Sequence, residues 1–173
     1  MRILLSNDDS IHAEGFGVLE AVARSLSDDV WVCAPESEQS GASHSLTLHR
    51  PLRLRKVDEK RYACDGTPTD CVLLAINHLM KDNPPDLVLS GVNHGCNIAE
   101  DVTYSGTIAA AMEATLLGVR AVALSQDYES GRPIDFAPAR DWAAKVVERA
   151  IAVDWAPEVL VNVNFPACRA DAV

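Results

Sequence analysis

Apolar and polar residues follow one another along this chain in blocks that are typical of α/β proteins. Short apolar runs bounded by polar or turn-forming residues predict buried strands, and we expect these at residues 2–6, 30–34, 86–90, 121–125 and 159–164. Apolar residues at helical spacing predict helices between the strands, at residues 15–26, from Thr67 to Leu79, at 105–117 and at 138–152. Residues 46–57 are expected to be extended, with a break at Pro51.

Two helix ends carry local signals that strengthen this interpretation. Thr67-Pro68-Thr69-Asp70 combines a Thr cap, a Pro in the first turn and an acid three residues after the cap. Gly118 closes the Ala-rich helix before it. Strands separated by helices of this length form a parallel sheet that is covered on both faces. We therefore expect a single α/β domain over residues 1–173.

The composition is that of one globular domain, because 173 residues with 48% hydrophobic content can bury a core of ordinary size. No apolar run approaches the ~18 residues of a membrane span, and the start has no signal-peptide pattern, so we expect a cytoplasmic protein. The five cysteines are odd in number and scattered, and neither they nor the five histidines show metal-ligand spacing. A bound metal would therefore be held by oxygen atoms.

The formal net charge of −10 argues against a nucleic-acid polymer as a main partner, and without a long apolar run we expect no membrane partner. The same field would repel a small anionic substrate. A divalent cation and backbone N–H donors would be the local remedy for such a substrate.

The first strand ends in Asn7, Asp8 and Asp9. Ligands of open parallel sheets bind beyond the carboxyl ends of the strands, and two adjacent carboxylates there repel one another unless a cation neutralises them. Such oxygen ligands suit Mg²⁺ or Mn²⁺. The alternative is a solvated Asp-Asp turn that caps the next helix.

Two further loops follow strand ends and carry polar side chains. Residues 39–45 contain Ser40 and Gly41, and residues 91–97 contain Asn93 and Asn97. Together with the first strand end they offer carboxylate, hydroxyl and amide oxygens, which suit a hard cation. Taken alone, Ser- and Gly-rich loops usually only form turns.

The start of the Ala-rich helix has the chemistry of a phosphate site. Ser105 and Thr107 place hydroxyls on either side of Gly106, where free N–H groups and the positive end of the helix dipole would lie. Ser105 could equally be a plain N-cap. A metal-suited cluster combined with an anion-suited helix start indicates a phosphate ester as ligand.

Five motifs in order along the chain resemble the SurE family, whose members are metal-dependent 5′/3′-nucleotidases, also called survival-protein phosphatases. The motifs are Asn-Asp-Asp at 7–9, Ala-Pro with Gln-Ser-Gly-x-Ser-x-Ser at 34–45, Gly-Thr-Pro-x-Asp-Cys-Val at 66–72, Ser-Gly-Val-Asn at 90–93 and Asp-Val-x-Tyr-Ser-Gly-Thr at 101–107. The resemblance continues to Asn-x-Asn-Phe-Pro at 162–166.

The resemblance implies a Rossmann-like three-layer fold with a mostly parallel sheet, and a homodimer or homotetramer. It implies one divalent ion, Mg²⁺ or Mn²⁺, held by a set of four residues: Asp8, Asp9, Ser40 and Asn93. The phosphate would then lie among a second set: Gly41, Asn97, Ser105, Gly106 and Thr107.

The chain departs from the family pattern in three places. Ser10 stands where Gly is common, which costs free energy if that position needs a positive φ. Glu14 stands where Pro or a small residue is common. The family's C-terminal region, an extended hairpin and a swapped helix at the subunit interface, is expected to be missing from the 173 residues.

These features predict metal-assisted hydrolysis of nucleoside monophosphates, with Asp8 and Asp9 as the catalytic residues. A metal-bound water, an Asp-oriented water or an aspartate could be the nucleophile, and Asp8 is the first choice for an acid–base or nucleophilic role. Non-nucleotide phosphoesters or polyphosphate are alternative substrates.

Other classes fit the sequence less well. A receiver-like signalling domain would need an Asp where Ser90 stands. A dehalogenase-type phosphatase would need Asp-x-Asp, and a dinucleotide-binding module would need a Gly-x-Gly-x-x-Gly after the first strand. His12, His44 and His94 lie in or beside the site loops, but a single loop histidine is more often a surface residue, so none is placed in the site.

Overall fold

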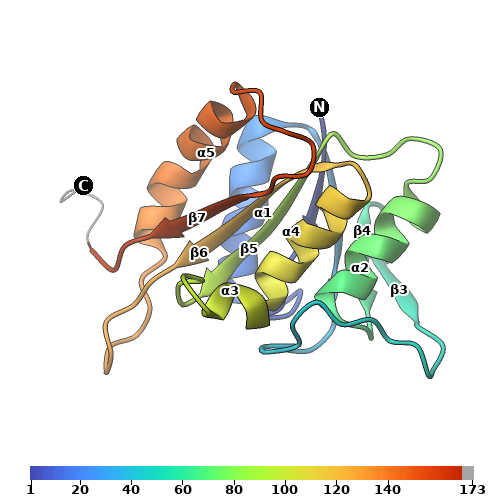
Figure 1. Cartoon of the computed structure of the whole chain (residues 1–173), viewed down its shortest axis with the longest axis horizontal. Coiled ribbons are helices and arrows are strands. Elements are labelled where there is room, and N and C mark those ends of the chain that lie inside the picture. The colour runs from blue at the N-terminus through green and yellow to red at the C-terminus, as the bar shows by residue number, and fades with distance from the viewer. Residues whose placement is uncertain (169–173) are drawn as a thin grey trace.

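A seven-stranded sheet lies between two layers of helices in the computed structural model, which describes residues 1–168 (Figure 1). The strands, in the order β3-β4-β2-β1-β5-β6-β7 across the sheet, are β3 (Leu54–Asp58), β4 (Arg61–Cys64), β2 (Asp29–Pro35), β1 (Arg2–Ser6), β5 (Leu87–His94), β6 (Arg120–Gln126) and β7 (Val161–Phe165). Only β3 runs antiparallel to its neighbour. The helices are α1 (Glu14–Leu26), α2 (Pro68–Leu74), α3 (Asp101–Tyr104), α4 (Gly106–Leu116) and α5 (Ala137–Ile151).

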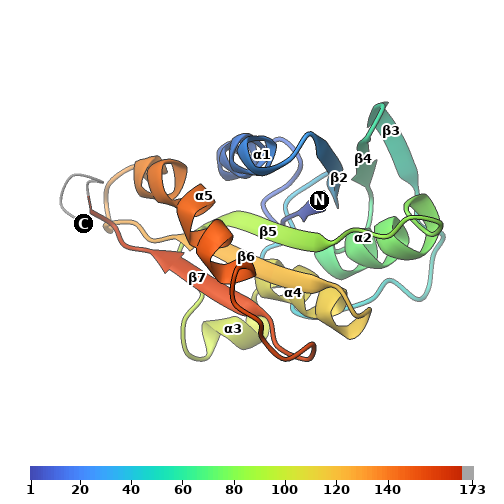
Figure 2. The ribbon, with the colours of Figure 1, turned by 90° about the horizontal axis from the view of Figure 1, so that it is seen from above.

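The two helical layers bury separate core clusters against opposite faces of the sheet (Figure 2). Successive side chains of a strand point to opposite faces, so Ile3 and Leu5 pack with α1 and α5 while Leu4 packs with α2 and α4. The central strands are therefore apolar on both sides, as the uninterrupted apolar runs predict. The prediction of an α/β fold with a mostly parallel, doubly covered sheet is confirmed.

Between β1 and β5 the side on which the next strand is added reverses, and this reversal creates a place where a ligand can bind. From β1 the chain passes through α1 to β2 on one side, whereas from β5 it passes through α4 to β6 on the other. Helices α1 and α4 cover opposite faces (Figure 2). The connections that leave β1 and β5 consequently diverge, which in open α/β sheets opens a crevice at the carboxyl ends of the strands.

The structure differs from the sequence expectation in two segments. The stretch 46–57, expected to be extended, forms a strand only from Leu54, because residues 46–53 are irregular. The following strand, β4, was not predicted. The expected loop at 91–97 is wrong at its start, because β5 continues through Gly91 to His94, and α3 at Asp101–Tyr104 was not predicted. Gly91 has φ +130°, which lets the strand change its course without ending.

Local signals placed the helix ends well. Thr67 and Asp70 form the reciprocal capping box, with Asp70 N 3.1 Å from the Thr67 hydroxyl and Thr67 N 2.9 Å from Asp70 Oδ2. The helix continues as a π-helical turn, η1 (Ala75–Leu79). Gly118 follows α4 with φ +78°, the left-handed conformation of a C-terminal cap. None of the helices in residues 1–168 has the length and apolarity needed to cross a membrane.

Candidate functional site

The candidate site lies at the carboxyl ends of β1 and β5. Asp8 follows β1 by two residues and is 4% exposed. The backbone leaves Asp8 and Asp9 through a strained turn, because the next residue, Ser10, which stands where the family commonly has Gly, has φ +87°. The Asn7 side chain braces this turn by donating from Nδ2 to the Ser10 carbonyl at 2.7 Å. A non-glycine residue at such a φ costs of order 1–3 kcal/mol, and such strain clusters at functional sites.

The start of α4 closes directly on the Asp8 side chain. The Thr107 hydroxyl donates a hydrogen bond to Asp8 Oδ1. A Cβ at position 106 would lie 2.7 Å from the Asp8 Cβ and 2.9 Å from Asp8 Oδ2, so only glycine allows this approach. Ser105 caps the helix by accepting from Ile108 N at 3.1 Å. The structure thus brings Asp8, Gly106 and Thr107 into contact and makes Ser105 the N-cap.

The electrostatics of the two aspartates are those of an anionic site. Burial raises the pKa of Asp8 from 3.8 to about 6, and the neighbouring Asp9 charge adds to this rise, against the hydrogen bond from Thr107. Burial also raises the pKa of Asp9, with a contribution from Glu38, while the His94 backbone N–H opposes the rise. Among residues 1–168, no Lys or Arg forms an ion pair with either aspartate.

This environment fits a divalent cation. Two adjacent, desolvated carboxylates without a cationic side chain are costly unless an ion neutralises them. The buried Asn7 Oδ1 beside them has no hydrogen-bond partner in the described part of the chain. Over the same residues, no three His, Cys, Asp or Glu side chains gather as a metal cluster, so an ion here would need hydroxyl or amide oxygens as well.

The loop after β2 reaches the site through its backbone. Gln39 N donates to the Asp8 carbonyl at 2.7 Å, which brings Ser40 and Gly41 next to the end of β1. Ser40 is exposed and its hydroxyl donates to Glu38 Oε1 at 2.9 Å. Gly41 is also exposed and has φ +73°. Both residues are therefore open to solvent next to the end of β1.

The end of β5 meets the other aspartate. His94 N donates to Asp9 Oδ2 at 3.0 Å. The preceding Asn93 is half-buried, and its Nδ2 donates to the Gly95 carbonyl at 2.8 Å, which leaves the amide oxygen of Asn93 uncommitted to that bond. A register shift in the β5–β6 pairing between Ser90 and Asn93 accompanies this bend of the strand. Such irregularities re-aim side chains next to active sites.

Asn97 is the predicted site residue that the structure directs elsewhere. It is buried, its Nδ2 donates to the Ser125 hydroxyl at 2.9 Å, and its backbone N donates to Asn164 Oδ1 at 2.7 Å. These contacts fasten the loop after β5 to β6 and β7. No hydrogen bond within residues 1–168 joins Asn97 to Ser105 or Thr107.

Three residues near the site were not found from the sequence. His94 contributes through its backbone N–H, which no residue pattern reveals. Glu113 on α4 is buried and lies 2.8 Å from His44 Nε2, so it ties the loop after β2 to the helix that carries Thr107. Tyr128 packs edge-on against the His94 ring, with 5.0 Å between the ring centroids. A carboxylate in an Ala-rich helix was the one available signal for Glu113.

Together, the strand order and this site define an α/β protein of the Rossmann-like type with an acidic, oxygen-rich site at its switch point. The family described as "Survival protein SurE" matches residues 3–173. The chain belongs to the SurE family.

Relatives and a solved structure agree with this assignment over the whole chain. A "5'-nucleotidase SurE" of Paramagnetospirillum magneticum is 59% identical over 173 residues, which are 100% of this chain and 66% of the relative. One of Rhodospirillum rubrum is 61% identical over 175 residues, covering 99% of this chain and 67% of the relative. The crystal structure of the Sure protein from Aquifex aeolicus superposes with a TM-score of 0.90 at 38% identity, covering 99% of this chain and 68% of that one. The chain therefore spans about two thirds of the length of the proteins it matches.

Proposed function

We propose that this chain hydrolyses phosphomonoesters, and nucleoside monophosphates in particular, with the help of one divalent metal ion. The observation that carries the proposal is the contact of the buried Asp8 carboxylate with Gly106 and Thr107 at the start of α4. It places a group suited to a cation beside one suited to an anion. The name 5'-nucleotidase, which curated relatives bear, supports the same reaction and points to nucleotides as its substrates.

Asp8, Asp9, Ser40 and Asn93 are the residues that would hold the ion, which we expect to be Mg²⁺ or Mn²⁺. When bound, a divalent ion polarises a phosphoryl oxygen and neutralises charge that develops during its transfer. The contacts of the chain itself serve to hold the ligands still: Thr107 fixes one oxygen of Asp8, and the His94 N–H fixes one oxygen of Asp9. Asn93 offers an amide oxygen at the neighbouring strand end.

The phosphate would lie between the start of α4 and the loop at Ser40 and Gly41. Helix α4, which has 11 residues, directs the positive end of its dipole toward this region. Ser105, Gly106 and Thr107 would bind the phosphate mainly through backbone groups, since both hydroxyls already have partners. Gly41 would supply backbone at the open side, and Asn97 would act by holding the loop after β5. Asp8 is our first choice for proton transfer or nucleophilic attack.

The comparisons do not favour the signalling alternative. The receiver-like reading required an acidic residue at the position of Ser90, and that residue is a buried serine inside β5. A phosphatase acting on non-nucleotide esters or polyphosphate differs from the proposal only in substrate. The same assay can therefore compare these substrates directly.

The decisive experiment measures phosphate release from a panel of nucleoside monophosphates, with EDTA and then with added Mg²⁺ or Mn²⁺. Metal-dependent release that disappears in Asp8→Asn and in Asp9→Asn, with circular dichroism showing both variants folded, is the expected result. Retained turnover in both variants would refute the assignment of the metal site. Faster phosphate release from polyphosphate than from every nucleotide would overturn the proposed substrate but leave the proposed metal and phosphate site unchanged.

We also expect the full-length protein to be a homodimer or homotetramer in the cytoplasm, with no nucleic-acid polymer or membrane as partner. The strongly acidic character of the chain supports the last point. Light scattering of the purified full-length protein measures the assembly, and a monomer at micromolar concentration would contradict this expectation.

A further inference from the structure

A hollow of about 280 Å³ opens beside Asp9, and none of its lining residues belongs to α4. Its lining comes from five separate parts of the chain and includes Asp9, Glu14, Glu38, His94, Ile134 and Phe136. We refer to it as the Asp9 hollow. Because it begins at a proposed metal ligand, a molecule whose phosphate lies at the metal could extend its remainder into this space.

The lining of the Asp9 hollow has the mixed chemistry of a small-molecule site. Ile134 and Phe136 supply apolar surface, whereas Glu14 and Glu38 supply hydrogen-bond acceptors and negative charge. Carboxylates accept hydrogen bonds from hydroxyl and amino groups but repel a second phosphate. The hollow therefore suits a neutral group that carries such donors, and ribose with a nucleobase is a group of this kind.

One of the residues that line the Asp9 hollow, His94, carries an aromatic ring. The backbone N–H of His94 is bound to Asp9 at 3.0 Å, and the next residue, Gly95, donates to the Gln126 carbonyl at 2.8 Å. Tyr128 contacts the His94 ring at an interplanar angle of 73° and so limits the movement of that ring. Within residues 1–168, the His94 ring forms no hydrogen bond and is exposed. An exposed, supported aromatic ring is the type of surface on which nucleobases stack.

We propose that the Asp9 hollow receives the nucleoside part of the substrate, with the base stacked on His94 and Tyr128 holding that ring in place. This inference rests on the proposed nucleotidase function and adds a residue that determines specificity. His94 would contact the substrate, whereas Tyr128 would be a positioning residue. Glu14, which departs from the family pattern, would accept hydrogen bonds from the nucleoside.

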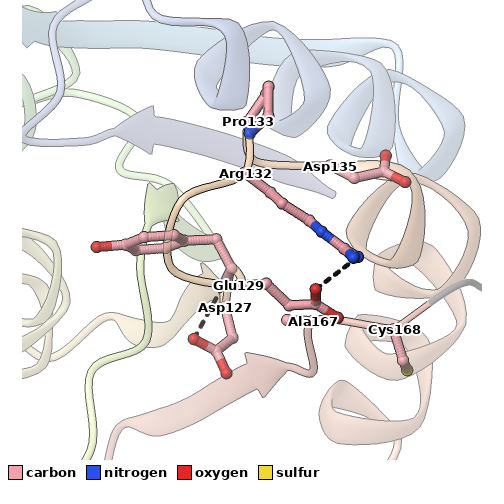
Figure 3. Close-up of a pocket in the computed structure, with 8 residues that line it drawn as sticks. Asp127, Glu129, Arg132, Pro133, Asp135, Ala167 and Cys168 are labelled. Atoms are coloured by element: carbon pink, nitrogen blue, oxygen red, sulfur yellow. Dashed lines mark hydrogen bonds and ion pairs between the residues drawn. The ribbon is translucent and has the colours of Figure 1, made fainter.

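A neighbouring hollow fits the substrate less well. It has a volume of about 160 Å³ and is lined by the loop that follows β6 and by Ala167 and Cys168 (Figure 3). Its wall carries Asp127, Glu129 and Asp135, and the guanidinium of Arg132 points to Glu129, with which it forms an ion pair at 2.6 Å (Figure 3). None of its lining residues is a proposed metal or phosphate ligand, so a molecule whose phosphate lies at the metal has the Asp9 hollow, which begins at Asp9, as the adjoining space.

The test compares AMP with ribose 5-phosphate, which lacks the base, in the 173-residue chain and its variants. His94→Ala removes the ring but keeps the backbone N–H on Asp9, and His94→Phe restores a ring. We expect the ratio of kcat/KM for AMP to that for ribose 5-phosphate to fall roughly 5- to 150-fold in His94→Ala, the range given by the loss of one stacked base. We expect His94→Phe to restore most of this kcat/KM ratio. We expect Tyr128→Ala to lower the ratio by a smaller factor, through a higher KM for AMP.

Tyr104→Ala is the matched control, because it removes an exposed ring on α3 that does not line the hollow. An unchanged ratio in His94→Ala, or an equal fall in Tyr104→Ala, would overturn the inference. A second measurement follows the ring proton resonances of His94 and Tyr128 while adenosine is added without metal. Shifts of these resonances support the inference, and their absence contradicts it. Failure of the proposed function has a different signature, which is the absence of metal-dependent phosphate release from both substrates by the parent chain.

Discussion

The close approach of α4 to Asp8 predicts that Gly106→Ala inactivates the protein without unfolding it. The added Cβ would lie 2.7 Å from the Asp8 Cβ and 2.9 Å from Asp8 Oδ2. Carbon atoms pack at roughly 3.5–4.0 Å, so the carboxylate or the helix must shift by about 1 Å. A displacement of this size at a reacting group can lower the rate by about 100-fold.

Two opposing effects set the stability of Gly106→Ala. Alanine favours the helix by up to about 1 kcal/mol, whereas forcing a methyl group into a filled space costs about 1–3 kcal/mol. The net loss should therefore be about 0–2 kcal/mol, which leaves the protein folded. Urea unfolding measures this change, and phosphate release at saturating metal measures the rate.

Gly17→Ala is the matched control for this substitution. Gly17 also lies in a helix, α1, but a Cβ there would have no atom within 4 Å apart from its chain neighbours and the backbone of its own helix. It should gain about 1 kcal/mol of stability from helix propensity and keep the parent's rate. A Gly106→Ala variant with the parent's rate would refute the conclusion that Asp8 is held against the start of α4 for catalysis.

Two further predictions concern charged contacts. His44→Ala leaves the buried Glu113 carboxylate without its partner and should lower the free energy of unfolding by roughly 1–3 kcal/mol. Urea unfolding of the double variant with Glu113→Ala should show a smaller loss of this free energy than the sum of the two single losses. Strict additivity of the losses would argue against coupling between the two residues. Lys60 first, and then Arg2, lower the pKa of Asp29 below 3.8. The contribution of this carboxylate is therefore complete above pH 3.8 and is lost as the pH falls through its lower folded value. Asp29→Asn should be about 0.2–1 kcal/mol less stable than the parent at pH 7, and this difference should vanish in acid; a difference that is constant with pH would contradict the assignment.

The sequence predicts elements well where burial is strong and continuous. Leu4 and Leu5 are buried on opposite faces, so β1 is apolar without a break from Ile3 to Leu5 and its end before Asn7 is sharp. Strand β4 was missed because only Ala63 and Cys64 are buried in it, and two small residues after Arg61 and Tyr62 give no periodic signal. The continuation of β5 was missed because Gly91 is a turn signal in a sequence, whereas here its positive φ bends a strand that goes on.

The residues of the site were easier to name than to arrange. Local rules place Ser105 at the start of a helix and Asp8 at the end of a strand, and both positions are confirmed. Contacts between distant segments, such as His94 N with Asp9 or His44 with Glu113, depend on how strands and loops are offset in three dimensions. Single-residue patterns carry no information on those offsets, and so the turning of Asn97 toward β7 was not foreseen.

The bond between Thr107 and Asp8 also bears on how the protein is made, because it joins residues 99 positions apart. Closing a loop of this length costs chain entropy before any contact repays it. At translation speeds of about 5–20 residues per second, Asp8 leaves the ribosome roughly 5–20 s before Thr107 does. During that interval its carboxylate stays hydrated and the site does not exist. Enzymatic activity of a nascent chain would thus report that the centre of the sheet and α4 have come together.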